Sequence, residues 1–320
     1  MNTFSEKKKL QAIIHLRLDI ASGFYNFDNK YYISASVRRD GSSVFSTDAR
    51  WGTFYSASAA WRLDQEDFIK NISFIDNLKL RSSWGQTGND GGISNYAWQP
   101  LYALGWNNAT EPGILQSSLG SKSLEWETNT AFDVALEFGL FKNRISGTVE
   151  YFDRQSTNLI FAVPLPLSVG IGSETRNIGS MYNRGYEFNV NYNAINKDNF
   201  NWNISANLTL DKNKVTSLPN GQDILGGTFS DVNIAPNLII REGESINSIY
   251  GIRYWGVNPA NGNPVYYKAD GTLVQGNLAA TTNYKVFDPA NPSDITQASS
   301  LSSAEDKVVL GNTLPTYYGA

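Results

Sequence analysis

Hydrophobic and polar residues alternate along many segments of the chain. From Phe132 to Leu140 every second residue is large and apolar, and the residues between them are polar or small. A period of two residues is typical of a β-strand that has one face in water and the other in an apolar environment. The same alternation predicts seven further strands, at residues 16–24, 31–37, 55–63, 78–84, 145–151, 186–192 and 202–210, and a ninth begins at residues 316–320.

The polar positions of these strands hold nearly all of their charged residues, together with many Asn, Ser, Thr and Gly. One such strand alone is more typical of a soluble sheet, because antiparallel sheets commonly bury one face. The strands approach the roughly 9–11 residues of a tilted membrane span. Aromatic residues near the strand ends fit membrane-interface girdles, although they suit any strand: Tyr31, Tyr55, Phe141, Tyr151, Tyr186, Phe200 and Trp202.

Short and long connections between the predicted strands follow one another in strict alternation. In an up-and-down sheet every second connection emerges on the same side, so all the long ones share a side. Outer-membrane barrels show this asymmetry, with short periplasmic turns and long extracellular loops. The sequence therefore predicts an all-β, antiparallel, up-and-down transmembrane β-barrel segment with long extracellular loops, one of which covers residues 213–313. The long connections are residues 40–52, 86–126, 154–184 and 211–315.

Composition excludes several classes of function. Among 320 residues there is no Cys and one His, which removes disulfides, thiolate zinc sites and most His-dependent catalysis. The 26 Lys and Arg against 30 Asp and Glu leave no excess of basic residues for nucleic-acid binding. About eight strands and the start of another cannot close a barrel, since an open edge in lipid leaves backbone groups unpaired. We therefore expect residues 1–320 to be an incomplete part of a larger barrel.

Several segments closely resemble the barrel of SusC/RagA-type TonB-dependent outer-membrane transporters. The similarity follows the order of the family from about residue 30 to residue 218 and resumes weakly at residues 308–320. It is carried by KYYISASVRRDGSS (30–43), RWGTFYSASAAWRL (50–63), NLKLRSSWGQTGN (77–89), LEWETNTAFDVALEFGLFKNRISGTVEYFDRQSTNLI (124–160), NIGSMYNRGYEFNVN (177–191) and NWNISANLTLDKNKVTSL (201–218).

The resemblance implies a barrel of about 22 strands with an N-terminal plug, in the outer membrane of a Gram-negative, Bacteroidota-like cell. It also implies a SusD-like surface lipoprotein and the TonB complex as partners, and glycans or peptides as substrates. The chain departs from the family pattern because we find no plug domain, TonB-contacting segment, signal peptide or C-terminal strands in it. Family members often carry an Asp-rich loop, whereas residues 266–276 contain Asp270 alone, so we expect no metal and no cofactor.

Aromatic residues of the long loops are the candidate substrate-binding groups. They could stack on sugar rings, pack against the partner lipoprotein, or serve loop packing, since they combine broad apolar faces with polar tips. The candidates are Tyr96, Trp98, Tyr102 and Trp106 in one loop, and Tyr254 and Trp255 in another.

Catalysis is not expected. Asp133, Glu137 and Glu150 could form an acid–base cluster, but on a polar barrel face they are interpreted as ordinary solvated charges, and His15 has no partners for chemistry. The predicted function is therefore import of oligosaccharides or other oligomeric nutrients. Two alternatives stay open: a soluble or surface β-sandwich that binds glycans, and a TonB-dependent siderophore receptor.

Overall fold

The protein is described by a computed structural model that covers residues 16–228, 237–277, 280–302, 305–313 and 317–319. The chain divides into two compact units, one formed by Met1–Lys212 with Thr316–Ala320 and the other by Asn213–Pro315. Antiparallel strands dominate both units, which confirms the predicted all-β class. His15 lies outside the described residues. No described helix has the length and apolar content to cross a membrane.

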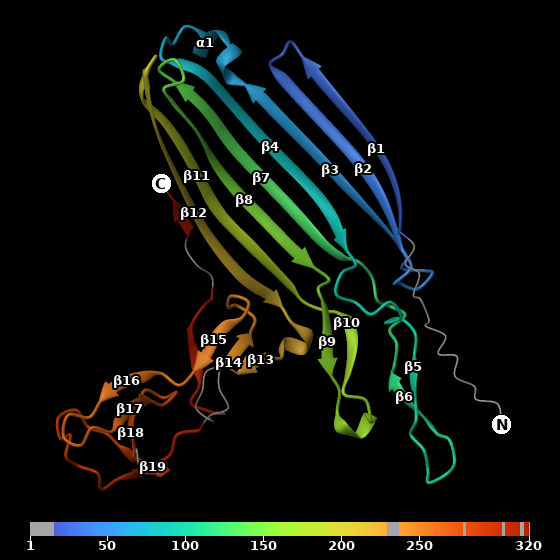
Figure 1. The fold of residues 1–320 in the computed structure, drawn as a ribbon, viewed down its shortest axis with the longest axis vertical. Helices are drawn as coiled ribbons and strands as arrows, with labels where there is room; N and C mark the ends of the chain where they lie inside the picture. The colour runs from blue at the N-terminus through green and yellow to red at the C-terminus, as the bar shows by residue number, and fades with distance from the viewer. Residues whose placement is uncertain (1–15, 229–236, 278–279, 303–304, 314–316, 320) are drawn as a thin grey trace. The chain divides into compact units, whose positions relative to one another are not determined.

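The first unit is built on a nine-stranded antiparallel sheet (Figure 1). Strands that follow one another in this sheet are also neighbours in chain order, apart from two inserted hairpins and the strands of the second unit, which come between β12 and β22 in the chain. In sheet order the strands are β1 (Leu16–Phe27), β2 (Tyr31–Ser42), β3 (Trp51–Arg62), β4 (Ile75–Asn89), β7 (Glu127–Leu140), β8 (Ile145–Thr157), β11 (Ser180–Lys197), β12 (Phe200–Ser217) and β22 (Tyr317–Gly319).

The strands are longer than their side-chain alternation predicts, mainly at the end of the sheet that carries the long connections. Alternation defines residues 186–192 of β11, whereas the strand covers Ser180–Lys197. Likewise, β4 begins at Ile75 and ends at Asn89 rather than covering residues 78–84. Backbone pairing continues into segments of mixed polarity, because ladder hydrogen bonds do not depend on side-chain type.

The short connections at the other end are tight. Asp28 and Asn29 both adopt a left-handed conformation with φ of 52°, which Asp and Asn tolerate better than other non-glycine residues. The β3–β4 connection is helical, with η1 (Leu63–Gln65) and α1 (Asp67–Lys70), and alternation does not predict it. It is fastened to the sheet through Glu66, which accepts hydrogen bonds from the Tyr31 hydroxyl at 2.6 Å and the Trp61 indole at 3.0 Å.

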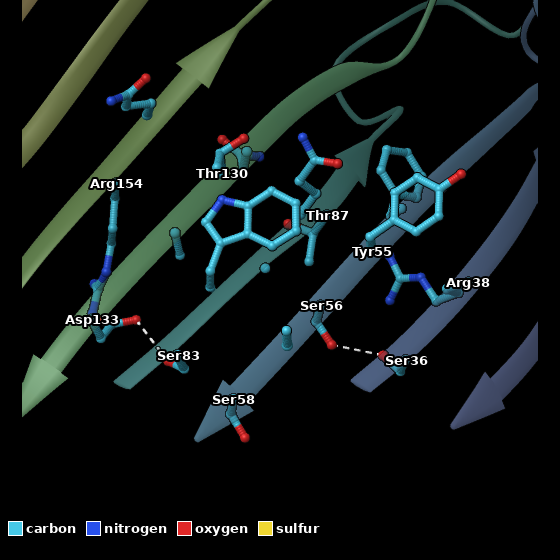
Figure 2. Close-up of a pocket in the computed structure, with 18 of the residues that line it drawn as sticks. Ser36, Arg38, Tyr55, Ser56, Ser58, Ser83, Thr87, Thr130, Asp133 and Arg154 are labelled. Carbon is cyan, nitrogen blue, oxygen red and sulfur yellow. Dashed lines mark hydrogen bonds between the residues drawn. The ribbon is translucent and has the colours of Figure 1, made fainter. Parts of the chain in front are cut away.

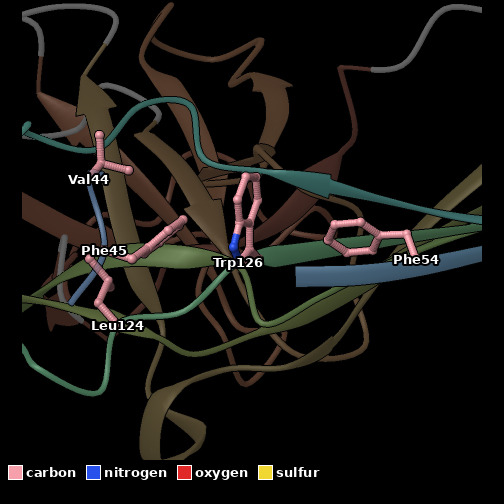
Figure 3. Packing of buried hydrophobic residues seen from close by; sticks show 5 residues of the cluster. All are labelled: Val44, Phe45, Phe54, Leu124 and Trp126. Atoms are coloured by element: carbon pink, nitrogen blue, oxygen red, sulfur yellow. The ribbon is translucent and has the colours of Figure 1, made fainter. Parts of the chain in front are cut away.

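The long connections carry a small hydrophobic core, here called the loop cluster: Val44, Phe45, Phe54, Leu124 and Trp126 (Figure 3). The Phe45 and Phe54 rings lie 5.1 and 5.9 Å from the Trp126 ring, centroid to centroid. A Cβ at Gly88 would overlap the Phe54 ring, so the absence of a side chain at this position of β4 makes room for the ring. Two hairpins extend from the same end of the sheet: β5 (Leu101–Leu104) with β6 (Ile114–Ser118), and β9 (Ile160–Pro164) with β10 (Ser173–Asn177), which are followed in Figure 1.

The second unit contains two smaller antiparallel sheets. One consists of β13 (Ile224–Thr228), β14 (Asn237–Ile240), β15 (Ser248–Gly251) and β21 (Val308–Gly311); the other of β16 (Tyr254–Val257), β17 (Pro264–Tyr267), β18 (Leu273–Asn277), β19 (Ala280–Val286) and β20 (Ala298–Ser299). The fully buried Asn258 amide donates to Gln275 Oε1 and to the Pro292 carbonyl, both at 2.8 Å. This buried network orders the turns around the second sheet. The location of this unit outside the cell stays a prediction.

Candidate functional site: a two-faced wall with a polar trough

The strand register separates polar from apolar side chains across the nine-stranded sheet. Ser34 of β2 lies opposite Ser58 of β3, which lies opposite Ser83 of β4, and Ser83 faces Asp133 of β7. We call this side the polar face. The charged residues at the predicted polar positions of β2, β3, β4, β7, β8 and β11 lie on it: Arg38, Arg62, Lys79, Arg81, Asp133, Glu137, Glu150 and Glu187.

The opposite side, the apolar face, holds most of the large hydrophobic residues of β2, β3, β4, β7, β8 and β11, and many of them are exposed. Ile33 is 56% exposed and Tyr55 52%, and Trp84, Leu136 and Val149 are also classed as exposed. Monomeric soluble proteins rarely expose apolar surface on this scale. The sheet therefore has a hydrophobic face that no described part of its own unit covers, which is the property of a wall in contact with lipid.

Strand β1 is the exception to this separation. Its register with β2 sets Ile20 opposite Arg38 and Phe24 opposite Ser34, so these two apolar residues lie on the polar face. Tyr25 and Phe27, at the end of the strand, lie on the apolar face. Arg17 and Asp19 consequently lie on the apolar face, where Asp19 is opposite Arg39. Alternation within residues 16–24 is regular, so the reversal is visible only from the pairing of β1 with β2.

The polar face is hollowed into a trough of about 760 Å³ (Figure 2). The hollow exists because the register aligns small residues on three adjacent strands. Ser34–Ser58 and Ser36–Ser56 hydroxyl pairs, each 2.7 Å apart, cross from β2 to β3. A Cβ at Gly85 would lie 3.2 Å from the Ser56 Cβ, so this glycine keeps the floor low. We call this hollow the polar trough; its floor is formed by Ser34, Ser36, Ser56, Ser58, Ser83 and Gly85.

Three charged side chains line the polar trough. The Arg38 guanidinium is paired with Asp40 at 2.9 Å and lies over the Phe54 ring, and its buried Nε has no hydrogen-bond partner. Across the trough, exposed Arg154 lies over Phe152, 5.0 Å from the ring centroid. Asp133 accepts a 3.4 Å hydrogen bond from Ser83. The lining therefore offers hydroxyl groups and charges of both signs, with the neighbouring phenyl rings covered by guanidinium groups.

Asp133, Glu137 and Glu150 are the carboxylates considered above as an acid–base cluster. The prediction that they are ordinary solvated charges is wrong for the two glutamates. Glu137 lies 3.2 Å from Lys79 and 2.8 Å from Arg81, and Arg81 also pairs with Glu150. These ion pairs cross three strands because the register aligns opposite charges. The glutamates are thus held by cations, and Asp133 is separated from them as a lining residue of the trough.

The candidate aromatic residues of the first unit are distributed along one segment. Tyr96 and Trp106 are exposed, Trp98 is half-buried, and Tyr102 lies on β5 with 58% exposure. No ring–ring contact joins these four side chains within the described structure. They form an accessible aromatic loop rather than a packed core, and their contact with substrate stays a prediction.

Tyr254 and Trp255 are adjacent on β16, at a point where the register with β17 shifts by one residue, and their rings have different partners. The Tyr254 ring contacts Tyr266 at 5.7 Å, and the Trp255 ring contacts Phe287 at 5.2 Å. The structure therefore does not combine these two residues into one aromatic surface. Among the described residues no group of three acidic or histidine side chains is arranged to hold a metal ion.

Sequence reasoning identified the polar face but missed the polar trough and the pairing of its neighbouring carboxylates. Both depend on which residues of separate strands lie opposite one another. The only signal in the sequence is the run of serines at every second position near residues 34–36 and 56–58. Such a run predicts small polar groups on a face, but not a hollow.

Comparison with known proteins agrees with this architecture. The family model described as "TonB dependent receptor-like, beta-barrel" matches residues 21–293. TonB-dependent receptor SusC of Bacteroides thetaiotaomicron is 31% identical over 296 residues, covering 82% of this chain and 29% of that relative. TonB-dependent receptor P3 of Formosa agariphila is 34% identical over 244 residues, covering 73% and 24%. A solved structure of the RagAB peptide transporter has a TM-score of 0.71 at 26% identity, covering 87% of this chain and 29% of that one.

The sheet has one exposed apolar face and one polar face. Together with these similarities, this places the chain in the class of outer-membrane β-barrel proteins. The chain belongs to the TonB-dependent receptor β-barrel family and is of SusC/RagA type. It spans less than a third of the length of each of these relatives. The predicted resemblance is confirmed.

Proposed function

We propose that the chain forms part of the wall of an outer-membrane receptor that imports oligosaccharides or peptides. The two-faced sheet carries this proposal: its apolar face would meet lipid, its polar face would line the water-filled lumen, and its long connections would face outward. The similarity to the RagAB peptide transporter supports an oligomeric substrate. The polar trough and the aromatic loop would both contact substrate as it passes.

A SusD-like surface lipoprotein and the TonB complex are the proposed partners. The SusC and RagA similarity supports a partner of this kind at the outward-facing loops. Neither alternative is favoured by the structure. A glycan-binding β-sandwich would cover its apolar face with a second sheet, whereas the apolar face of this unit is exposed. The similarity to SusC and to RagAB also favours oligomers over siderophores as the substrate.

The test is uptake by cells in which the receptor gene is deleted and restored. Fluorescently labelled oligosaccharides and peptides are supplied, and restoration is expected to recover uptake of one class. Trp106→Ala is expected to lower that uptake several-fold, because it removes a 63% exposed aromatic surface from the loop. Phe68→Ala is the matched control, since Phe68 is 65% exposed but lies in α1 at the short-connection end.

Each outcome has a defined meaning. If deletion leaves uptake of every labelled oligomer unchanged, the import proposal fails. Uptake that depends on the receptor but is the same for Trp106→Ala and wild type removes this residue from the substrate path.

A further inference from the structure

Two arginine side chains lie over the Trp51 ring on the apolar face, at the long-connection end of the sheet. The Arg39 guanidinium carbon is 4.8 Å from the Trp51 ring centroid, and that of Arg17 is 5.7 Å from it. Gly41 is opposite Trp51 in the register, and a Cβ at Gly41 would lie 2.6 Å from the indole ring. The missing side chain lets the indole lie close over β2, within reach of both cations. We call Arg17, Arg39 and Trp51 the rim site.

Strand geometry places the rim site at the edge of the apolar band. Trp51 and Trp61 lie at opposite ends of β3 and both project from the apolar face. Their ten-residue separation corresponds to about 33 Å along the strand. At a tilt of about 40° this is ~25 Å along the membrane normal, the height of the apolar band of such barrels. Arg39 is opposite Thr53, which lies two residues from Trp51 on the same face of β3. The rim site therefore lies at headgroup level.

The rim site has an excess of positive charge that the protein does not neutralise. Arg17 is paired with Asp19 at 3.4 Å, with 71% and 52% of the two side chains exposed. Arg39 makes no ion pair with any residue that the structure describes. Arg184, on the same face and at the same end, is by contrast paired with Asp153 at 2.9 Å. Two cations and one carboxylate leave a free, accessible guanidinium beside an aromatic ring.

We propose that Arg17 and Arg39, held on Trp51, bind the phosphate group of a lipid in the outer leaflet. The proposal rests on the outer-membrane placement given above. A guanidinium matches phosphate through two parallel N–H donors, and the ring supports the cation without neutralising it. Tryptophan is itself enriched at the membrane interface. Continuity with the apolar face makes a membrane lipid the occupant, because a lipid can set its chains on the apolar face while its phosphate meets the arginines.

Retention of lipid by the purified receptor in detergent is the test. The probes are phosphorylated lipid A and the same lipid with its phosphate removed, and native mass spectrometry measures the bound fraction. Wild type is expected to retain the phosphorylated form preferentially. Removing one cation near an anionic headgroup weakens binding about fivefold. Arg39→Gln is therefore expected to reduce retention about fivefold, and the Arg17→Gln, Arg39→Gln double variant further.

Arg144→Gln is the matched control. Arg144 also lies near an aromatic ring, with its guanidinium carbon 5.9 Å from the Tyr192 ring centroid, but at the short-connection end. It donates hydrogen bonds to the Asn193 and Ala194 carbonyls, and lipid retention should not change when it is replaced. Arg39→Lys keeps the charge and removes the planar pair of donors, so retention is expected to fall less than in Arg39→Gln.

Three results would overturn the lipid site: equal retention by wild type and the double variant, equal retention of both lipids, or displacement by inorganic phosphate at the concentration of the lipid. The last result would show a site for the free anion. Oligomer uptake is measured in cells with the same variants and is expected to be unchanged. Failure of the lipid site with intact uptake is thus distinguishable from failure of the import proposal, in which uptake does not depend on the receptor.

Discussion

Replacement of Phe45 by alanine tests whether the long connections are ordered by their own core. Phe45 is fully buried and its ring contacts Trp126. It lies in the β2–β3 connection, whereas Leu124 and Trp126 precede β7. The ring thus joins two loops that are far apart in sequence. The substitution removes the ring and leaves the backbone of the loop unchanged.

The expected cost follows from the burial of this side chain. Complete burial of a phenylalanine stabilises by about 1.5–3 kcal/mol, and the cavity left by its removal raises the total cost to about 3–5 kcal/mol. The sheet does not depend on Phe45 for its ladder hydrogen bonds. The substitution is therefore expected to lower the free energy of local loop opening and to leave the unfolding free energy of the whole unit unchanged.

Amide hydrogen exchange is the assay. The reporters are the amides of Ala49 and Leu124, which donate to Ser46 and Ser121 at 3.2 and 3.3 Å within the two loops. Because about 1.4 kcal/mol is a factor of ten, their exchange should accelerate more than a hundredfold. Amides in the middle of β7 should be unchanged, and Phe68→Ala should leave all of them unchanged. Equal acceleration of loop and strand amides, or no acceleration, would refute a separate loop core.

Two further predictions concern charged groups of the first unit. Arg81→Met leaves two half-buried glutamates without their shared cation, so the unfolding free energy in denaturant should fall by about 1–3 kcal/mol, and Arg81→Lys should lose less. Burial raises the pKa of Asp64, but hydrogen bonds from Arg62 and Gln65 outweigh it and hold the pKa below its ordinary value. The ionised form thus stabilises the β3–β4 connection above the unfolded pKa of about 3.9, and this is lost as pH falls through the lower folded value. On acidification the protection of amides 66–72, corrected for the slower intrinsic exchange at low pH, should fall in wild type and not in Asp64→Asn; the same fall in both would contradict it.

The division of the sheet into two faces could be predicted from the sequence because it needs only a period of two. Within the predicted segments of β2, β3, β4, β7, β8 and β11 most large apolar residues lie on one side of the strand, however the strands are paired. The pattern within a strand does not decide which face of the sheet its apolar residues join. A shift of one residue in the pairing with the neighbouring strand moves them to the other face. Residues 18–24 of β1 have this reversal, with Phe24 opposite Ser34, and no pattern within these residues alone could reveal it.

The polar trough and the loop cluster could not be predicted for related reasons. The floor of the trough requires Ser36, Ser56 and Gly85 to be neighbours on three strands, which register alone decides. The loop cluster requires Phe45 and Trp126 to meet across about eighty residues of chain. Loop segments have no period that would indicate their partners. For the same reason the sequence located aromatic residues in the loops without showing that Tyr254 and Trp255 contact different rings, Tyr266 and Phe287.

Phe54 connects the two features that sequence reasoning missed. Its ring lines the polar trough and is also part of the loop cluster, where it packs against Trp126. Arg38, on the trough side, lies over the same ring. A displacement of the loops that moves Trp126 must therefore move one wall of the trough or open a gap beside Phe54. Because packed interiors resist gaps, the loop arrangement and the shape of the trough are physically coupled through this single side chain. A substrate or partner that reorders the loops would thereby reshape the trough beneath them.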